Sequence, residues 1–125
     1  MEEIVSTQVQ PYKEESRMIT LRELCDHTLV TRRTIQCYEG KGLLKAVSKN
    51  KMGHLLYDDS AIEQVNLIRF YQSIGFTLKD IKGFETMAPD EFKSLMSEKI
   101  ITLQAERVLL EDKIKKITTI IKDED

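Results

Sequence analysis

The last third of the chain constrains the fold most, because residues 89–122 contain no glycine and no proline after Pro89. Proline is favoured at the first position of a helix, so this stretch can form one helix of about 33 residues, or about 50 Å at 1.5 Å per residue. One series of residues recurs along it at alternating steps of four and three, and Arg107 is its only charged member. We call this series the seam; it comprises Met96, Ile100, Leu103, Arg107, Leu110, Ile114, Ile117 and Ile121. A heptad seam of this kind predicts a dimerisation coiled coil.

Two arrangements could bury the seam. The helix could fold back on its own chain, or it could pair with the same helix of a second copy. In a chain of 125 residues, the part that precedes the helix makes a domain too short to cover so many turns. We therefore expect a homodimer.

The composition narrows the class of protein. Hydrophobic residues make up 41% of the chain and charged residues 32%, with only five glycines and two prolines. These values exclude collagen-like and low-complexity chains and favour a helix-rich protein with one core. Apolar runs fall short of the roughly 18 residues that a membrane span needs, and no signal-peptide pattern is present, so we expect a cytoplasmic protein.

Basic residues are concentrated in one segment. Residues 17–57 contain eight basic residues against three acidic ones, whereas residues 1–16 carry a net charge of −3 and residues 58–125 a net charge of −4. Local charge density, not the sum, decides electrostatic binding. The segment therefore suggests a surface for a polyanion, and on charge alone a solvated basic surface is an equal alternative.

Two short helices are predicted inside this basic segment. Thr20 and Glu23 have the spacing of a capping box, so a helix begins there and runs to about His27. Thr31 can cap a second helix, which Gly40 stops. Two short helices joined by a tight turn indicate a helix-turn-helix motif.

Arg32 and Arg33 fall in the first turn of the second helix. The helix dipole favours acidic residues at that end, so two arginines there cost some stability. The first residues of a recognition helix are those that reach base edges and phosphates. The placement of Arg32 and Arg33 therefore favours an anionic partner.

Residues 43–57 predict a hairpin. Two apolar stretches flank a basic centre, Ser48–Gly53, which contains a glycine. Beside a helix-turn-helix motif, such a hairpin is a wing.

Two more helices are predicted after the wing. Asp58 or Asp59 can cap the first, which ends before Gly75. Thr77 opens the second, which ends by Ala88. Their apolar faces are core.

The predicted architecture is mainly α, with three parts. Residues 1–17 form a flexible extension, because they show no helix or strand period. Residues 18–88 form a winged helix-turn-helix domain, and residues 89–125 form the dimerisation coiled-coil helix.

Three motifs together resemble the mercury-resistance-regulator (MerR) family of bacterial transcription regulators. The family's recognition helix reads V-S-x-R-T-I-R-Y-Y-E-x-x-G-L-L, its wing G-Y-R-x-Y, and the end of its next helix L-G-F-S-L-x-E-I. The counterparts here are VTRRTIQCYEGKGLL over residues 30–44, GHLLY over residues 53–57 and IGFTLKDI over residues 74–81. The likeness extends over about residues 18–122, nearly all of the patterned chain.

The resemblance implies a function as well as a fold. Family members are homodimers whose long helices form an antiparallel coiled coil. They bind a pseudopalindromic site in an overlong promoter spacer and distort the DNA so that RNA polymerase can use it. Double-stranded DNA, a second copy and RNA polymerase are therefore the expected partners.

The candidate DNA-binding residues lie on the second helix and in the wing. Arg33 is the strongest candidate, and Lys49 and Lys51 are candidate phosphate contacts for which solvated lysines are the alternative. The full set is Thr31, Arg32, Arg33, Thr34, Gln36, Tyr38, Lys49, Lys51, His54 and Tyr57.

The chain departs from the family pattern at four positions. Gln36 replaces an arginine and Cys37 a tyrosine in the recognition helix, while His54 replaces a tyrosine and Leu55 an arginine in the wing. Gln36 could instead read adenine. The departures keep two alternatives open: a protein-interaction module that has lost DNA contacts, or an excisionase-like architectural factor.

Other chemistry finds little support in the sequence. Cys25 and Cys37 have no metal-ligand spacing and are expected to be buried, reduced thiols, and His27 and His54 are solitary. No phosphate-binding glycine loop and no catalytic constellation is present. We expect no cofactor, no metal and no enzymatic activity.

Overall fold

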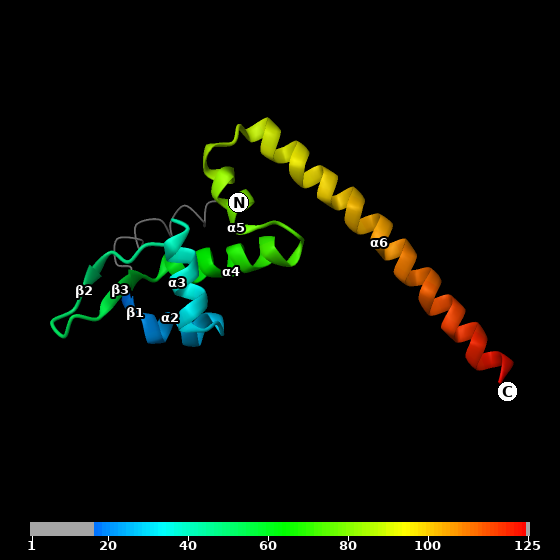
Figure 1. The fold of residues 1–125 in the computed structure, drawn as a ribbon, viewed down its shortest axis with the longest axis horizontal. Coiled ribbons are helices and arrows are strands. Elements are labelled where there is room, and N and C mark those ends of the chain that lie inside the picture. Colours follow the sequence, from blue (N-terminus) through cyan, green and yellow to red (C-terminus); the bar gives the residue numbers. More distant parts are fainter. Residues whose placement is uncertain (1–16, 125) are drawn as a thin grey trace, which may run out of the picture. The chain divides into compact units, whose positions relative to one another are not determined.

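The computed structural model describes residues 17–124, so the extension predicted over residues 1–17 lies outside the described residues except for Arg17. The chain forms two compact units, an N-terminal unit that ends at Gly83 and a C-terminal unit that begins at Phe84. Figure 1 shows the elements of each. Those of the N-terminal unit are β1 (Met18–Thr20), α2 (Leu21–Thr28), α3 (Arg32–Gly40), β2 (Ser48–Lys49), β3 (Leu55–Asp58), α4 (Ser60–Ser73) and α5 (Leu78–Gly83).

Both helices of the helix-turn-helix motif begin at the predicted caps. The Glu23 amide donates to Thr20 Oγ1 at 3.1 Å, and the Thr20 amide donates to Glu23 Oε1 at 2.8 Å, which completes the capping box of α2. The hydrogen bond from the Thr20 amide to the Glu23 carboxylate is the main reason that the pKa of Glu23 lies below its usual value. At α3, the Thr34 amide donates to Thr31 Oγ1 at 3.1 Å. Local sequence therefore fixes where each helix starts.

A three-stranded antiparallel sheet in the order β1-β3-β2 carries the wing. Strand β1 was not predicted; it pairs along β3, with Ile19 opposite Tyr57. The prediction that Ser48–Gly53 is all loop is wrong at its start, because Ser48 and Lys49 form β2 opposite Leu56 and Leu55.

The wing loop is closed by one side chain. Asn50 Oδ1 accepts hydrogen bonds from the amides of Met52 at 2.9 Å and His54 at 3.0 Å. Gly53 has a φ of 84°, a left-handed conformation that glycine adopts without strain. Asn50 and Gly53 therefore let the chain reverse immediately before β3.

The core lies between the helices and the sheet. Its largest fully buried side chains are Leu24 of α2, Ile35 of α3, Tyr57 of β3 and Val65 of α4. These four elements each place at least one fully buried side chain in the core, which holds α3 against the sheet.

The start of α4 and the end of α5 can be compared with the predicted helix boundaries. Helix α4 begins after Asp59 as predicted, but the side chain that accepts from the Ser60 amide, at 3.1 Å, belongs to Asp58. The helix expected to end by Ala88 ends at Gly83, and a separate 3₁₀ turn follows over Phe84–Thr86.

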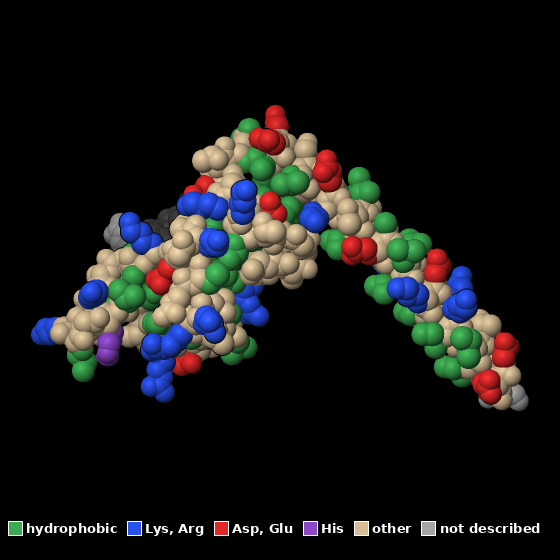
Figure 2. Space-filling model, viewed as in Figure 1, with side chains coloured by type: hydrophobic (Ala, Val, Ile, Leu, Met, Phe, Trp, Pro, Cys, Tyr) green, Lys and Arg blue, Asp and Glu red, His purple; other side chains and the backbone are tan. Residues whose placement is uncertain are grey.

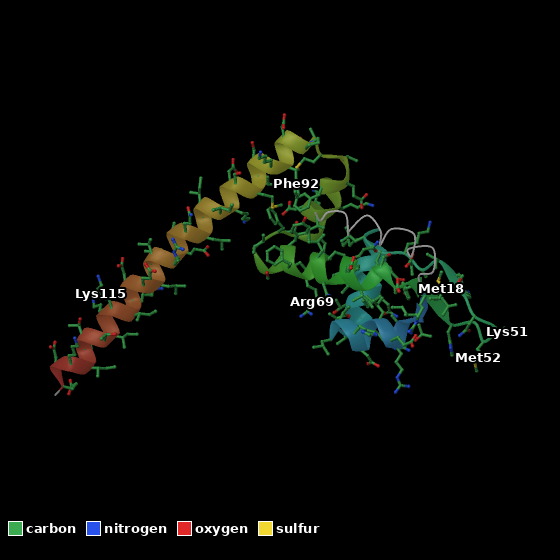
Figure 3. The ribbon with its side chains drawn as sticks, turned by 180° about the vertical axis from the view of Figure 1, so that it is seen from behind. Met18, Lys51, Met52, Arg69, Phe92 and Lys115 are labelled. Carbon is green, nitrogen blue, oxygen red and sulfur yellow. The ribbon has the colours of Figure 1, made fainter. Side chains whose placement is uncertain are left out.

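The C-terminal unit is dominated by α6 (Pro89–Asp123), a single helix of 35 residues, which confirms the long helix predicted from the sequence. Near its start the rings of Phe84 and Phe92 meet edge to face with centroids 5.2 Å apart. From residue 101 to residue 124 every side chain is exposed (Figure 3). Within the described chain, no helix has the combination of length and apolar character that crossing a membrane demands.

Candidate nucleic-acid interface

Helix α3 has two chemically distinct faces. Ile35 and Tyr38 are buried at 0% and 3% exposure, whereas Arg32, Arg33 and Gln36 are exposed. The first turn of α3 contains no acidic residue, so the two arginines meet an uncompensated positive dipole end. The exposed face is therefore strongly electropositive where the helix begins.

The wing adds more positive charge in the same unit. Lys49, Lys51 and His54 are all exposed, and Met52 at the loop tip is 78% exposed. Lys and Arg side chains gather over the wing and the neighbouring helices in Figure 2, and Lys51 and Met52 mark the wing tip in Figure 3. Lys49 and Lys51 are thus exposed in the same unit as the arginines of α3.

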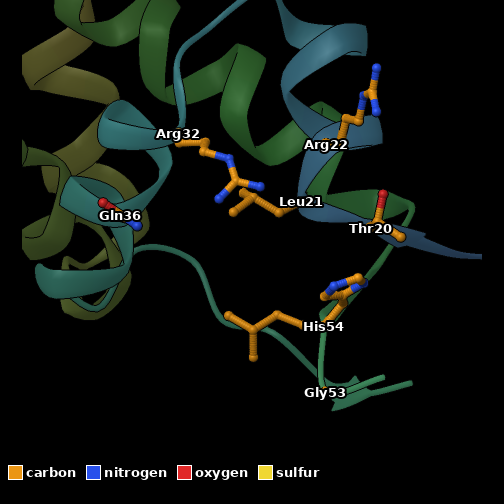
Figure 4. Close-up of a pocket in the computed structure, with 8 residues that line it drawn as sticks. Thr20, Leu21, Arg22, Arg32, Gln36, Gly53 and His54 are labelled. Carbon is orange, nitrogen blue, oxygen red and sulfur yellow. The ribbon is translucent and has the colours of Figure 1, made fainter. Parts of the chain in front are cut away.

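An open groove lies between α2, α3 and the wing, with a volume of about 590 Å³. We call it the basic groove; its lining residues are Thr20, Leu21, Arg22, Arg32, Gln36, Gly53, His54 and Leu55. Figure 4 shows Arg32 reaching from α3 toward Leu21, with His54 beside Thr20. Arg22, which sequence reasoning did not select, belongs to this groove because the fold brings the start of α2 next to α3.

The structure corrects the expectation that Tyr38 and Tyr57 contact DNA. Both rings are buried, at 3% and 0% exposure. The Tyr38 hydroxyl donates to Gln72 Oε1 at 2.8 Å, and the Tyr57 hydroxyl donates to Glu39. These tyrosines position α3 against α4 and β3 and leave no ring surface for a partner.

Burial also changes the acidity of both phenols. Desolvation raises the pKa of Tyr38 above its ordinary value. It raises the pKa of Tyr57 further, because the hydrogen bond to Glu39 also stabilises the protonated phenol. Both hydroxyls therefore remain donors at neutral pH.

Thr31 and Thr34 are occupied mainly with the helix itself. The Thr31 hydroxyl caps α3 and lies 3.1 Å from the Thr34 hydroxyl. Thr31 is exposed and Thr34 half-buried. Their clearest role is to hold the first turn that presents the arginines.

Arg69 of α4 braces the helix-turn-helix motif and was missed from the sequence. Its Nη1 donates to the Thr28 carbonyl oxygen at 2.9 Å, at the turn where Leu29 adopts a left-handed φ of 59°. The two bonded residues are 41 positions apart, so no local pattern could have paired them. Arg69 therefore ties α4 to the end of α2, next to the turn that leads into α3.

The expectation that both cysteines are buried is wrong for Cys37, which is exposed on α3. Cys25 is half-buried, and desolvation raises the pKa of its thiol despite the opposing effect of Arg32. The family pattern places an aromatic residue at Cys37, so the burial expected there depended on residue type alone. Among residues 17–124, no three metal-ligating side chains cluster.

Comparison with known proteins decides the family. Residues 19–87 match the family described as MerR HTH family regulatory protein. The chain belongs to the MerR family. This confirms the resemblance inferred from the three motifs.

Relatives of known sequence agree with this assignment. The nodulation protein NolA of Bradyrhizobium elkanii is 35% identical over 99 residues, which is 78% of this chain and 45% of NolA. The mercuric resistance operon regulatory protein of Bacillus cereus is 32% identical over 59 residues, 47% of this chain and 45% of that protein. The chain therefore spans less than half the length of these relatives.

Solved structures confirm the winged helix-turn-helix fold of the MerR type. MtaN, the N-terminus of the Bacillus subtilis multidrug transporter activator, matches with a TM-score of 0.60 at 22% identity, covering 82% of this chain and 97% of MtaN. HiNmlR, a MerR family regulator lacking the sensor domain and bound to promoter DNA, matches with a TM-score of 0.65 at 20% identity, covering 79% of this chain and 80% of HiNmlR.

Proposed function

We propose that this MerR family chain is a homodimeric, sequence-specific DNA-binding transcription regulator. The observation that carries the proposal is the exposed face of α3, where Arg32, Arg33 and Gln36 project from a helix that the core holds rigidly beside a basic wing. Recognition helices of this motif enter the major groove with their first residues against base edges. HiNmlR, which shares the fold, was crystallised on promoter DNA.

In this proposal the exposed residues divide into two roles. Arg33 and Gln36 read base edges, since arginine pairs with guanine and glutamine with adenine through two hydrogen bonds. Arg32, Lys49 and Lys51 neutralise phosphates and set the register on the duplex. The conformation and position of α3 are held by hydrogen bonds of four side chains, those of Tyr38, Tyr57, Thr31 and Thr34.

Helix α6 supplies the surface through which a second copy of the chain binds. Its seam residues Ile100, Leu110, Ile114, Ile117 and Ile121 are 56–63% exposed in the single chain, and Leu103 is 42% exposed. A row of apolar side chains that long is stabilised by a partner helix through coiled-coil packing. Two N-terminal units joined in this way would bind the two half-sites of a pseudopalindrome, about one turn of the DNA helix apart.

The regulatory step is a distortion of the promoter. A dimer that grips two half-sites and the flanking backbone can hold DNA in a deformed geometry, with an energy that depends on the sequence deformed. RNA polymerase would then read a promoter whose elements have been realigned.

Gel shift and footprinting on the DNA upstream of the chain's own gene test the proposal. We expect protection of a two-fold symmetric site, and we expect Arg33→Ala to weaken binding by about 1–3 kcal/mol per lost base contact. The control Lys116→Ala removes one positive charge from an exposed position of α6 outside the seam and should bind as the wild type does. A footprint that survives Arg33→Ala unchanged would contradict the role of Arg33.

A different outcome would favour the protein-interaction alternative. Gln36 and Leu55 are uncharged where the family pattern has arginines, which weakens the electrostatic case for DNA binding. If no genomic fragment is protected while the purified protein captures a stoichiometric protein partner, the fold has been kept for another use.

A further inference from the structure

Glu39 is an acidic residue at a place where the helix dipole disfavours one. It stands in the last turn of α3, which contains no basic residue, so its carboxylate lies at the negative end of the helix. Its side chain is also half-buried, which removes part of its hydration. The contact that this carboxylate makes must therefore offset two unfavourable effects.

The carboxylate of Glu39 accepts a hydrogen bond from the Tyr57 hydroxyl. Of the four residues of β3, Tyr57 is the one that is buried, and its exposure is 0%. Strand β3 is the centre of the sheet, and it pairs with β2 to form the wing. The hydrogen bond therefore joins the end of α3 to the base of the wing.

The wing is a short hairpin. Its ladder comprises two residue pairs, Ser48 with Leu56 and Lys49 with Leu55. A two-stranded hairpin of this size is marginally stable by itself. The direction of the wing therefore depends on what anchors β3, and the buried anchor of that strand is Tyr57.

One side of α3 faces one side of β3. Gln36 and Glu39 are three residues apart, so they lie on the same side of the helix. Leu55 and Tyr57 are two residues apart, so they lie on the same side of the strand, and Lys49 shares that side because it is paired with Leu55. Gln36 and Leu55 both line the basic groove, and the hydrogen bond joins the same two elements farther along. The bond therefore limits how far α3 and the wing can separate.

We propose that Glu39 is a positioning residue, which holds the wing where its lysines reach the DNA backbone while α3 reads the major groove. The inference rests on the proposed function, and it adds a residue that does not itself contact DNA. Lys49 and Lys51 are exposed on the wing, and they neutralise phosphates only when the wing and α3 meet the same duplex. Without the hydrogen bond, α3 keeps its base contacts and the wing loses its fixed position.

Two substitutions of Glu39 separate its hydrogen bond from its charge. Glu39→Ala removes both, whereas Glu39→Gln removes the charge and keeps a carbonyl oxygen that can accept from Tyr57. Each neutralised phosphate contributes about 0.9 to the slope of log Kobs against log salt, so the loss of two lysine contacts in each chain of a dimer should make the slope shallower by about 3.6. We expect this change for Glu39→Ala and for Tyr57→Phe, and the wild-type slope for Glu39→Gln.

A double-mutant cycle identifies the wing as the part that Glu39 supports. In a chain that carries both Lys49→Ala and Lys51→Ala, Glu39→Ala should cause no further change of slope, because the contacts that it supports are already absent. An equal change in both backgrounds would mean that Glu39 acts elsewhere, and would overturn the proposal. Equal slopes for Glu39→Ala and Glu39→Gln would also overturn it, since the hydrogen bond would then play no part.

Two further measurements separate positioning from folding. Discrimination against a single base change in the site should be the same for the wild type and the Glu39 variants, because phosphate contacts carry no sequence information. Urea unfolding of each variant shows that the slopes are compared on folded protein. A purely structural role predicts lower affinity at every salt concentration with the wild-type slope, and that result would overturn the proposal.

Failure of this inference can be told apart from failure of the proposed function. If the wild type protects no DNA, both fail. If the wild type gives a footprint that Arg33→Ala weakens, but the slope is unchanged by Lys49→Ala with Lys51→Ala, the wing makes no phosphate contact for Glu39 to support. The positioning role is then overturned, and the reading of the major groove by α3 still stands.

Discussion

Replacing Leu110 with aspartate should separate the two subunits while leaving each subunit folded. Leu110 is 57% exposed in the single chain, and full burial of a leucine side chain contributes about 1.5–3 kcal/mol. Covering the exposed part therefore adds roughly 0.9–1.7 kcal/mol per copy, or about 2–3.5 kcal/mol for the two copies in a dimer. At about 1.4 kcal/mol per factor of ten, dimer dissociation should become roughly 30 to 300 times easier. The unpaired carboxylate adds to that cost.

The neighbouring residue provides a matched control. Leu109 is 60% exposed, nearly the same as Leu110, but it lies about 100° around the helix and outside the seam. Leu109→Asp makes the same chemical change and should alter dimer stability by less than about 0.5 kcal/mol. Sedimentation equilibrium over a range of concentrations measures both constants. Equal effects of the two substitutions, or a larger effect at Leu109, would refute the assignment of the seam.

Three further predictions concern the N-terminal unit. Thr31→Ala removes the cap of α3 and should lower the free energy of unfolding by about 1 kcal/mol in urea titrations, whereas an unchanged value would mean that the cap is redundant. Leu24→Ala empties a fully buried site and should cost about 2–5 kcal/mol in the same assay; a loss below that range would mean that the core collapses around the space. Because the pKa of Tyr57 is raised in the fold, by burial and by its hydrogen bond to Glu39, its stabilising effect is complete below the unfolded pKa of about 10 and declines as the pH rises above it. Unfolding measured from about pH 9 to pH 11 should therefore show a steeper loss for the wild type than for Tyr57→Phe, and parallel curves would contradict this.

Local signals in the sequence located the helices well. The capping pairs at Thr20 and Thr31 depend on residues three positions apart, so their geometry is encoded within one turn. The start of α6 at Pro89 was equally predictable, because proline and the absence of glycine act on the backbone directly. The family could be inferred because three such local motifs occur in the right order.

Contacts between distant residues could not be inferred in the same way. The pairing of β1 with β3 joins Ile19 to Tyr57, and the apolar pattern of three residues is too short to indicate a strand. The sequence also gave no sign that Tyr57 would face the core, since a tyrosine in a wing could point to either side of the sheet.

The candidate site was predicted in outline and refined by packing. The exposed positions of Arg32, Arg33, Lys49 and Lys51 agree with their proposed contacts, which remain predictions. Arg22 was overlooked because its own helix gives no reason to place it near α3. Only the assembled fold brings α2, α3 and the wing around one groove.

The most direct test of the whole account is the mass of the complex with DNA. Size-exclusion chromatography with multi-angle light scattering, on a duplex that carries the protected site, should give a complex of two chains per duplex at physiological salt. A complex of one chain per duplex, or a chain that elutes apart from the DNA, would contradict the claim that paired recognition helices read two half-sites.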